Sequence, residues 1–276
     1  MSARRPTRKT NTKKHFNQMR IKALYATTLA ALSLAACDNN SGQPAAADAP
    51  NNTTFCTPTT ANVATEKTEA ASSAEFSFQT EGSINPKTYK PGETASVSFN
   101  TFPRNVEEFQ KAQEQLGTTP EGAVVLELFA FEIYNHDHTA GEECLKMANT
   151  SLNTSSVLSI LKDRYNPKYG DYYTPQLVAS YLEGATPENA YKANKPFKVT
   201  IRSHKSNAYE DANSLKGTVL KLEVYSNGYD THWRGINVVK SKGETYYKVV
   251  NNPATYTQCK PVSFKTEEDY TDIWDQ

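Results

Sequence analysis

Hydrophobic residues at every second position predict two strands at the start of the folded part of the chain. Phe76 and Phe78 alternate with polar residues, and Val97 and Phe99 do the same after the turn sequence Lys90-Pro91-Gly92-Glu93. Strict alternation of this kind is typical of a strand with one buried face. We therefore expect folded structure to begin near residue 76 with a pair of strands.

Helical spacing follows these strands. Asn105 is a typical N-cap residue for a helix that stops at Gly117. Thr119-Pro120 then opens a segment that is apolar on nearly all sides and is interrupted only by Glu127 and Glu132. A helix without a polar face is buried, so this segment is the expected central helix. Further helices are expected near residues 140–149, 154–164 and 175–183.

Alternation returns in the C-terminal half and predicts an antiparallel meander. Asn227-Gly228 and Lys242-Gly243 are turn sequences that separate its last strands. The alternation is irregular around Gly235, which predicts a β-bulge there. The strands are expected near residues 197–201, 220–225, 231–240 and 244–250. In this arrangement the core face carries Val199, Ile201, Leu220, Leu222 and Val224, and the outer face carries Lys198, Arg202, Lys221 and Glu223.

The order of these elements defines the expected fold class, which is α+β. Several helices precede an antiparallel β-meander sheet, so the helices should pack on one face of that sheet. About 200 residues follow Phe76, which is enough for a single hydrophobic core. We therefore predict one α+β domain over residues 76–276, preceded by a signal peptide over 1–36 and a linker over 37–75.

The N-terminal segment combines basic residues, an apolar stretch and small residues. Its apolar part, residues 23–34, is shorter than the ~20 apolar residues of a transmembrane helix. It ends in Leu34-Ala35-Ala36-Cys37, which resembles the lipobox of secreted bacterial lipoproteins. A plain secretory signal with an unrelated cysteine is the alternative. Translation starts at either Met1 or Met19, since the sequence from Met19 onward is an ordinary beginning of a signal.

The resemblance to bacterial lipoproteins implies that Cys37 becomes the mature N-terminus and carries acyl chains such as palmitate. More than one chain gives stable membrane anchoring. Asp38 follows, and an aspartate there favours the inner membrane in enteric bacteria, with the outer membrane as the alternative. Residues 38–75 are rich in Ala, Asn, Thr and Ser, a composition that predicts a flexible tether. We therefore expect a domain that is lipid-anchored in the cell envelope and faces the periplasm.

Charge is unevenly divided at Cys37. Eight of the 30 basic residues and none of the 30 acidic residues precede it, so the remaining chain carries 22 basic and 30 acidic residues, a net charge of −8 with neutral histidines. An acidic protein repels polyanions, and nucleic acid is therefore not expected as a partner.

Three cysteines follow the lipobox, and an oxidising envelope would allow a disulfide. Cys56 and Cys259 lie in polar, irregular, exposed-looking sequence near the two ends of the chain, and we predict that they pair. Cys144 lies in an expected helix and is predicted to be a buried thiol. Pairing of Cys144 with either of the others stays open on sequence alone.

One short segment gathers side chains of the kind that bind metals. His136-Asp137-His138 is followed by Glu142 and Glu143, and imidazoles two residues apart on an extended segment can chelate zinc or copper. No further His or Cys lies at ligand spacing, so a polar loop between helices is the favoured interpretation and no metal is assigned. His136 and His138 are the candidate ligands should a metal bind.

A group of tyrosines is the candidate ligand-binding surface. It comprises Tyr165, Tyr169, Tyr172 and Tyr173, which lie around an Asn-Pro-Lys turn sequence. Rings of this amphipathic kind can stack on sugars or line a peptide groove. The favoured alternative is a loop whose tyrosines cover the core with their hydroxyls in water.

Motifs of catalysis are missing from the sequence. It contains no G-x-S-x-G, H-E-x-x-H, C-x-x-C, P-loop or dinucleotide fingerprint, so neither catalytic residues nor cofactors are predicted. We expect a non-enzymatic module that binds an envelope protein, a peptide or a glycan at the cleft between the helices and the sheet. The alternative is an envelope hydrolase or metal-dependent enzyme that uses residues 136–143.

Two further resemblances concern the folded domain. Helices followed by a meander that ends in a turn-Gly-polar-aromatic strand resemble the nuclear-transport-factor-2-like (cystatin-like) α+β folds. Thr119-Pro120-Glu121-Gly122-Ala123 and Gly184-Ala185-Thr186-Pro187-Glu188-Asn189-Ala190-Tyr191 are similar to an uncharacterised bacterial family. That similarity covers most of residues 85–250 and implies no particular activity.

Overall fold

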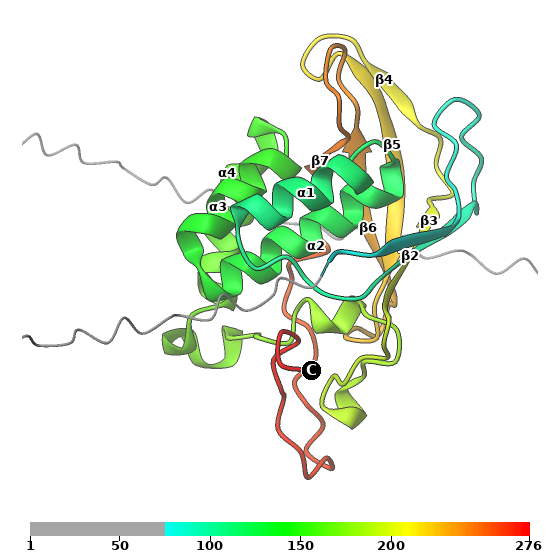
Figure 1. Ribbon diagram of the computed structural model, residues 1–276. Helices are drawn as coiled ribbons and strands as arrows, with labels where there is room; N and C mark the ends of the chain where they lie inside the picture. Colours follow the sequence, from blue (N-terminus) through cyan, green and yellow to red (C-terminus); the bar gives the residue numbers. More distant parts are fainter. Residues whose placement is uncertain (1–74) are drawn as a thin grey trace, which may run out of the picture. The chain divides into compact units, whose positions relative to one another are not determined.

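Figure 1 shows the computed structural model of the chain, which describes residues 75–276. Two strands, β1 (Phe78–Gly82) and β2 (Thr94–Phe99), come first. The helical part comprises α1 (Val106–Leu116), α2 (Pro120–His136), α3 (His138–Ala148), α4 (Ser151–Arg164) and the 3₁₀ helices η1 (Pro167–Tyr172), η2 (Ala179–Tyr181) and η3 (Pro187–Asn189). The remaining strands are β3 (Phe197–Ser203), β4 (Tyr209–Asp211), β5 (Gly217–Tyr225), β6 (Trp233–Val239) and β7 (Lys248–Asn251).

The strands form one open, antiparallel sheet. Their order is β1-β2-β3-β5-β6-β7, and β4 pairs with β5 outside this path. The four α-helices lie together on one face of the sheet (Figure 1). The predicted α+β class, with helices on one face, is therefore confirmed. None of the helices within residues 75–276 is long and apolar enough to cross a membrane.

The central helix α2 organises the core as predicted. Every residue from Pro120 to Tyr134 is buried. The helix begins at Thr119, whose hydroxyl oxygen accepts a hydrogen bond from the Gly122 N–H at 3.1 Å. The Phe129 ring packs edge-on against Phe99 of β2, with ring centroids 4.9 Å apart. This contact holds α2 against the sheet.

The two faces of β3 and β5 follow the predicted alternation. The core face carries Val199, Ile201, Leu220, Leu222 and Val224, all of them buried. On the outer face the Arg202 guanidinium donates a hydrogen bond to the Glu223 carboxylate at 2.8 Å and lies over the Trp233 ring, 4.0 Å from its centroid. The outer face is therefore charged and aromatic around Arg202 and Glu223. Near the start of β5 it carries a small apolar cluster of Leu215, Val219 and Val239, which is separate from the main core.

The β-bulge predicted at Gly235 is wrong. β5 and β6 pair without interruption, and Gly235 lies opposite Glu223. Trp233 shares the outer face with Gly235, so a large aromatic residue on that face broke the expected pattern while the backbone stayed regular. The register shift lies instead between Asn237 and Val238, on the side of β6 that pairs with β7.

The helix predicted over residues 175–183 is also wrong, because this segment forms turns and the short η2. The Thr174 hydroxyl donates to the Tyr172 carbonyl at 2.9 Å and does not cap a helix. The Ser180 carbonyl accepts a hydrogen bond from the Asn227 N–H at 3.0 Å. The N–H groups of Leu177, Tyr181 and Leu182 bond to carbonyls three residues back, which is the pattern of turns and 3₁₀ helices. These turns and the tertiary bond at Ser180 take the place of a continuous α-helix, so local propensity is overridden.

Candidate functional site

A cleft of about 550 Å³ lies where α3 and α4 meet the end of the sheet. Its walls come from α3, the α3–α4 junction, the first turns of α4, the β6–β7 connection and the segment before β5. The polar lining consists of Glu142, Lys146, Asn149, Thr150, Ser151, Thr154, Ser155, Ser214, Ser241, Glu244, Tyr246 and Lys248. The apolar lining consists of Leu152, Leu158, Leu215 and Val239.

The junction between α3 and α4 builds one wall of this cleft. Asn149 ends α3 in an extended conformation, and the Thr150 N–H donates to the Val249 carbonyl of β7 at 2.9 Å. Thr150 then precedes α4 as its N-cap residue without a side-chain capping bond, and its buried hydroxyl has no partner within residues 75–276. The first turn of a helix also presents N–H groups that no carbonyl of the helix accepts. The junction therefore contributes Asn149, Thr150 and Ser151 to the lining of the cleft.

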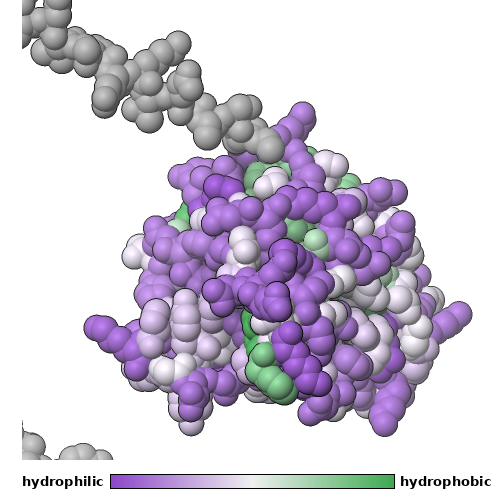
Figure 2. Space-filling model, turned by 90° about the horizontal axis from the view of Figure 1, so that it is seen from below, coloured by the Kyte–Doolittle hydropathy of each residue, from purple (hydrophilic) through white to green (hydrophobic). Residues whose placement is uncertain are grey.

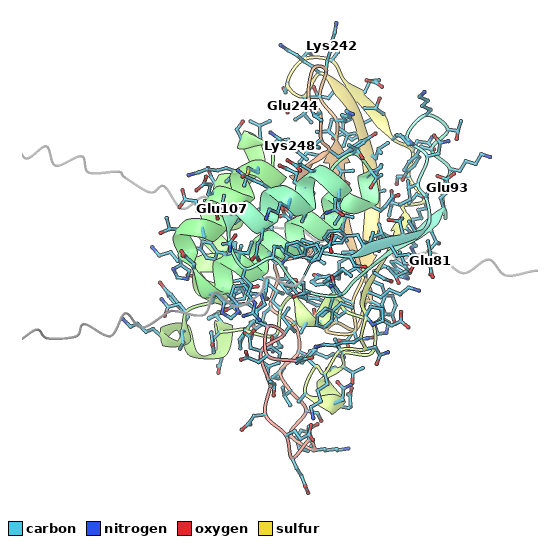
Figure 3. All side chains as sticks on the ribbon, viewed as in Figure 1. Glu81, Glu93, Glu107, Lys242, Glu244 and Lys248 are labelled. Atoms are coloured by element: carbon cyan, nitrogen blue, oxygen red, sulfur yellow. The ribbon has the colours of Figure 1, made fainter. Side chains whose placement is uncertain are left out.

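Two ion pairs flank the cleft. Lys146 Nζ lies 2.8 Å from Glu142 Oε1 on α3, and Lys248 Nζ lies 3.7 Å from Glu244 Oε2 on the strand side. Figure 3 shows Glu244 and Lys248 at the end of the sheet that carries the β6–β7 connection. Leu152, which is 65% exposed, adds an apolar side chain. The cleft thus combines both signs of charge, hydroxyl groups and apolar surface.

A closed ring of buried side chains supports the wall of the cleft. The Glu127 carboxylate accepts hydrogen bonds from Asn149 Nδ2 at 2.5 Å and from Asn252 Nδ2 at 2.7 Å. Asn153 Nδ2 donates to the Oδ1 atoms of both of these asparagines, at 2.6 Å each. Since Asn149 also lines the cleft, this ring ties α2, α4 and the segment after β7 to the ligand-facing wall.

Glu127 titrates far from the range of an ordinary glutamate. Complete burial raises its pKa to about 8, although the hydrogen bonds from Asn149 and Asn252 lower it. Desolvation therefore dominates, because the charged form loses more from leaving water than the two amide groups return.

A second polar cluster forms at the end of α2. His136 Nε2 lies 3.2 Å from Glu132 Oε1 and 3.2 Å from Asp272 Oδ1. The imidazole also stacks on the Trp274 ring, with centroids 3.6 Å apart. The ligand atoms of Glu132, His136 and Asp272 all lie within 4.8 Å of one another, so these three side chains could hold a metal ion.

Burial and charge act against each other in this cluster. Burial raises the pKa of Glu132 to about 7, and the hydrogen bond with His136 lowers it in part. Burial lowers the pKa of His136, but the hydrogen bonds to Asp272 and Glu132 outweigh it and raise that pKa to about 9. Burial also raises the pKa of Asp272, yet the bond from His136 holds it below its usual range. His136 is therefore a cation at neutral pH between two carboxyl groups.

The expected grouping of His136 with His138 and the following glutamates is not the one that the structure forms. The His138 ring stacks on Tyr134, with centroids 4.6 Å apart, and Glu142 pairs with Lys146. Asp137 separates the two histidines at the boundary of α2 and α3, where its carboxylate accepts hydrogen bonds from the first N–H groups of α3. The geometry of this helix–helix junction points the two imidazoles at different partners.

The four candidate tyrosines divide between core and surface. Tyr165 is buried, and its hydroxyl has no partner within residues 75–276. Its place in a ligand surface is therefore corrected to a place in the core, because it directly follows α4, whose inner side is buried. Tyr169, Tyr172 and Tyr173 are exposed in and beside η1, and the Arg164 guanidinium lies 5.7 Å from the Tyr172 ring centroid. None of the four lines the cleft.

Both described cysteines are buried thiols that are not bonded to each other. Burial raises the pKa of Cys144 and of Cys259 to about 12, so neither is a ready nucleophile. The exposed position expected for Cys259 is corrected, because the chain packs it against Gly228, which has no side chain to keep it out. Cys37 and Cys56 lie outside the described residues, so the lipidation and the Cys56–Cys259 disulfide stay predictions.

The fold and the cleft together define an α+β module with a polar cleft at the boundary of its helices and its sheet. The chain belongs to the family described as a domain of unknown function (DUF6935), which matches residues 101–263. That stretch contains the cleft and the Glu127 ring, whereas β1, β2 and Asp272 lie outside it. Nothing among curated proteins and nothing among solved structures matches the chain.

Proposed function

We propose that this protein is a lipid-anchored module of the bacterial cell envelope that binds a short peptide segment in the cleft between α3, α4 and β7. The cleft is the observation that carries the proposal. Its volume of about 550 Å³ lies within the range of roughly 300–1,000 Å³ that is typical of ligand sites. The Glu127 ring gives it a wall that is fixed before a ligand arrives, which reduces the entropy lost on binding.

The lining favours a peptide over a glycan. A peptide segment carries backbone N–H and carbonyl groups, and the serine and threonine hydroxyls of the cleft can pair with both. The ammonium groups of Lys146 and Lys248 could pair with carboxylates of a peptide. The carboxylates of Glu142 and Glu244 could pair with its ammonium groups, and Leu152 could contact an apolar side chain. A glycan is recognised by stacking on aromatic faces, and Tyr246 is the one aromatic residue among those that line the cleft.

The membrane part of the proposal rests on the sequence. Leu34-Ala35-Ala36-Cys37 has the form of a lipobox after a short apolar segment. The polar composition of residues 38–75 suits a tether between the lipid and the domain. A tethered cleft could meet peptide segments of other envelope proteins away from the bilayer surface.

A distant relation to nuclear-transport-factor-2-like (cystatin-like) folds is part of the same proposal. It is supported by helices that lie on one face of an antiparallel sheet. The strands β1 and β2, which precede the helices, depart from the simplest plan of those folds. Superposition of an experimental structure on members of that group, with the sheet order compared strand by strand, tests the relation.

Binding is tested by saturation-transfer NMR on the full chain in detergent micelles, with two probe pools. One pool contains tetrapeptides that carry one Lys and one Glu, and the other contains chito-oligosaccharides. The double variant Lys146→Ala/Lys248→Ala removes a cation from each side of the cleft. It is expected to weaken peptide binding by about tenfold or more, as the loss of a charge-assisted hydrogen bond does.

Lys87→Ala is the matched control for this experiment. Lys87 is an exposed lysine in the β1–β2 connection and does not line the cleft. Its replacement should leave peptide binding unchanged. Binding of oligosaccharides but not of peptides would contradict the proposed ligand class, and equal losses in the control and the double variant would contradict the proposed location.

A further inference from the structure

Three side chains of metal-ligand type meet at the end of α2, although two of them belong to this helix and the third to the C-terminal segment, more than 130 residues later. Glu132 and His136 lie one turn apart on α2, and Asp272 lies in the C-terminal segment that packs beside it. His136 Nε2 is 3.2 Å from one oxygen of each carboxylate. The imidazole therefore stands between two carboxylates that the sequence keeps far apart.

These separations match those of ligands around one metal ion. Metal–nitrogen and metal–oxygen bonds of roughly 2.0–2.2 Å place neighbouring donors about 2.8–3.1 Å apart in octahedral geometry and about 3.3–3.6 Å apart in tetrahedral geometry. Both separations from His136 are 3.2 Å, within about 0.1 Å of these values, and the separation of the two carboxylate oxygens is at most 4.8 Å. The Asp272 Oδ1 atom also accepts a hydrogen bond from the Trp274 N–H at 2.9 Å, which orients this carboxylate toward His136. Binding of one ion by all three groups would draw the two carboxylates closer together.

A second observation points to a cation at this place. Glu132 is completely buried, and its Oε2 atom has no hydrogen-bond partner within residues 75–276. A buried carboxylate oxygen without a partner is costly. The imidazole reaches only the other oxygen of Glu132, so the ion pair leaves this atom unsatisfied. A metal ion bound by both oxygens of Glu132 would satisfy it.

Further buried polar groups near Glu132, His136 and Asp272 have no hydrogen-bond partner among the described residues. The hydroxyls of Tyr165 and Tyr270 and the indole N–H of Trp274 are buried and unpaired among the described residues. Trp274 stacks on His136, and Tyr270 and Trp274 flank Asp272 in sequence. Such groups commonly orient the ligands of a metal or the water molecules that complete its coordination. Seen from below, the molecular surface is mainly hydrophilic and has only small, separate hydrophobic patches (Figure 2).

We propose that Glu132, His136 and Asp272 form a binding site for a divalent first-row transition-metal ion, which fastens the C-terminal segment to α2. One imidazole and two carboxylates suit zinc or manganese, whereas calcium and magnesium prefer oxygen ligands alone. The side chains of His136 and Asp272 are 30% and 24% exposed, which leaves a path from solvent. When the metal–nitrogen bond forms, the proton on Nε2 of His136 leaves to solvent. This site is separate from the peptide cleft and does not depend on the proposed function.

Isothermal titration calorimetry on the full chain, first stripped of metals with a chelator, tests the site with ZnCl2, MnCl2 and CaCl2 as probes. One zinc ion per chain should bind, and calcium should bind far more weakly. Asp272→Asn and His136→Asn should each weaken zinc binding by at least tenfold. Asp272 is partly exposed, so its variant is expected to fold, which circular dichroism verifies. Zinc should also raise the melting temperature of the unmodified chain by on the order of 5 °C, and that of Asp272→Asn by much less.

Two variants and one spectrum separate this site from other sources of zinc binding. Asp269→Asn removes an exposed carboxylate from the same segment, and His138→Asn removes the neighbouring imidazole; both should bind zinc normally. X-ray absorption at the zinc edge should show one imidazole nitrogen with oxygen donors and no sulfur. Sulfur ligands, equal losses in the control variants, or no zinc binding at all would overturn the proposal and leave the three side chains as an ion-paired cluster.

Discussion

Glu127 and Glu132 are fully buried carboxyl groups on one helix, and each is the centre of a polar cluster. Glu127 holds the ring of asparagines behind the cleft, and Glu132 holds His136 and Asp272. Both interrupt an otherwise apolar stretch of α2. A charged residue in such a stretch must find polar partners or change its protonation state. The two glutamates are therefore the positions at which α2 connects the core to the cleft wall and to the C-terminal segment.

The raised pKa of Glu127 predicts a specific dependence of stability on pH. With a folded-state pKa of about 8 against an ordinary value of 4.5, the folded state keeps a proton that the unfolded chain releases as the pH rises. The free energy of unfolding should therefore fall between pH 5 and 8 by at most ~1.4 kcal/mol per pH unit from this group. The stability that Glu127 contributes is fully present below pH 4.5 and is lost as the pH rises through 8. Urea denaturation at several pH values measures it.

Glu127→Gln is the comparison that isolates this group from Glu132 and from the other titrating residues. The stability of the unmodified protein relative to this variant should decrease steadily from pH 5 to 8. Parallel pH profiles for the two proteins would show that Glu127 keeps an ordinary pKa in the folded state. The test is the change with pH and not the difference in free energy of unfolding at any single pH. Gln has one acceptor oxygen where Glu127 has two, so the variant also loses a hydrogen bond at every pH.

Leu222 and Lys221 are adjacent in β5 but face opposite sides of the sheet. Leu222 is buried in the core, so Leu222→Ala should lower the free energy of unfolding by ~2–5 kcal/mol through lost burial and a cavity. Lys221 is partly exposed and lies near the Tyr209 ring on the outer face, so Lys221→Ala should cost less than ~1 kcal/mol. Chemical denaturation of both variants measures the difference, and equal costs would contradict the register of β5.

At the scale of elements, sequence predicts structure where the local pattern and the tertiary contacts agree. The helix over Val106–Leu116 has both its cap at Asn105 and its stop at Gly117 in the sequence, and both were found. β4 was not predicted, because its three residues, Tyr209, Glu210 and Asp211, are too few to show an alternating pattern and pair only with the start of β5. The turns over 175–183 were not predicted, because the Ser180 carbonyl bonds to Asn227 and the Glu183 N–H bonds to Lys198, and the local sequence does not reveal these partners.

Gly141 decides how closely α3 approaches α2. A Cβ atom at this position would lie 2.2 Å from the Tyr134 Cα, so the backbone of α2 would have to move. Gly141→Ala should therefore destabilise the protein by ~1–3 kcal/mol, although alanine favours a helix over glycine by ~1 kcal/mol. Ser156→Ala, at an exposed position of α4, is the control and should change little. A stabilising effect of Gly141→Ala in chemical denaturation would mean that the two helices can separate.

At the scale of the whole molecule, the sites could be predicted only in part. Sequence singled out His136 as a ligand-type residue and Glu127 and Glu132 as unusual, because each stands out from its neighbours. The sequence does not predict that Asp272 contacts His136 or that Asn252 contacts Glu127. These residues lie far from α2 along the chain, and only folding places them beside it. The cleft was expected between helices and sheet, but its lining depends on which turn ends α3 and on how β7 meets it.

Anchoring is the last prediction at this scale. If Leu34-Ala35-Ala36-Cys37 is a lipobox, Cys37→Ala should abolish incorporation of labelled palmitate and leave the protein released from membranes or unprocessed. The lost acyl chains each contribute ~0.8 kcal/mol per buried methylene, and the described residues contain no helix that could span a bilayer in their place. Cys56→Ala is the matched control, because it removes a cysteine outside the lipobox and should keep the label. Label that persists in Cys37→Ala but disappears in Cys56→Ala would place the anchor at Cys56, and the cleft would then be held by a shorter tether.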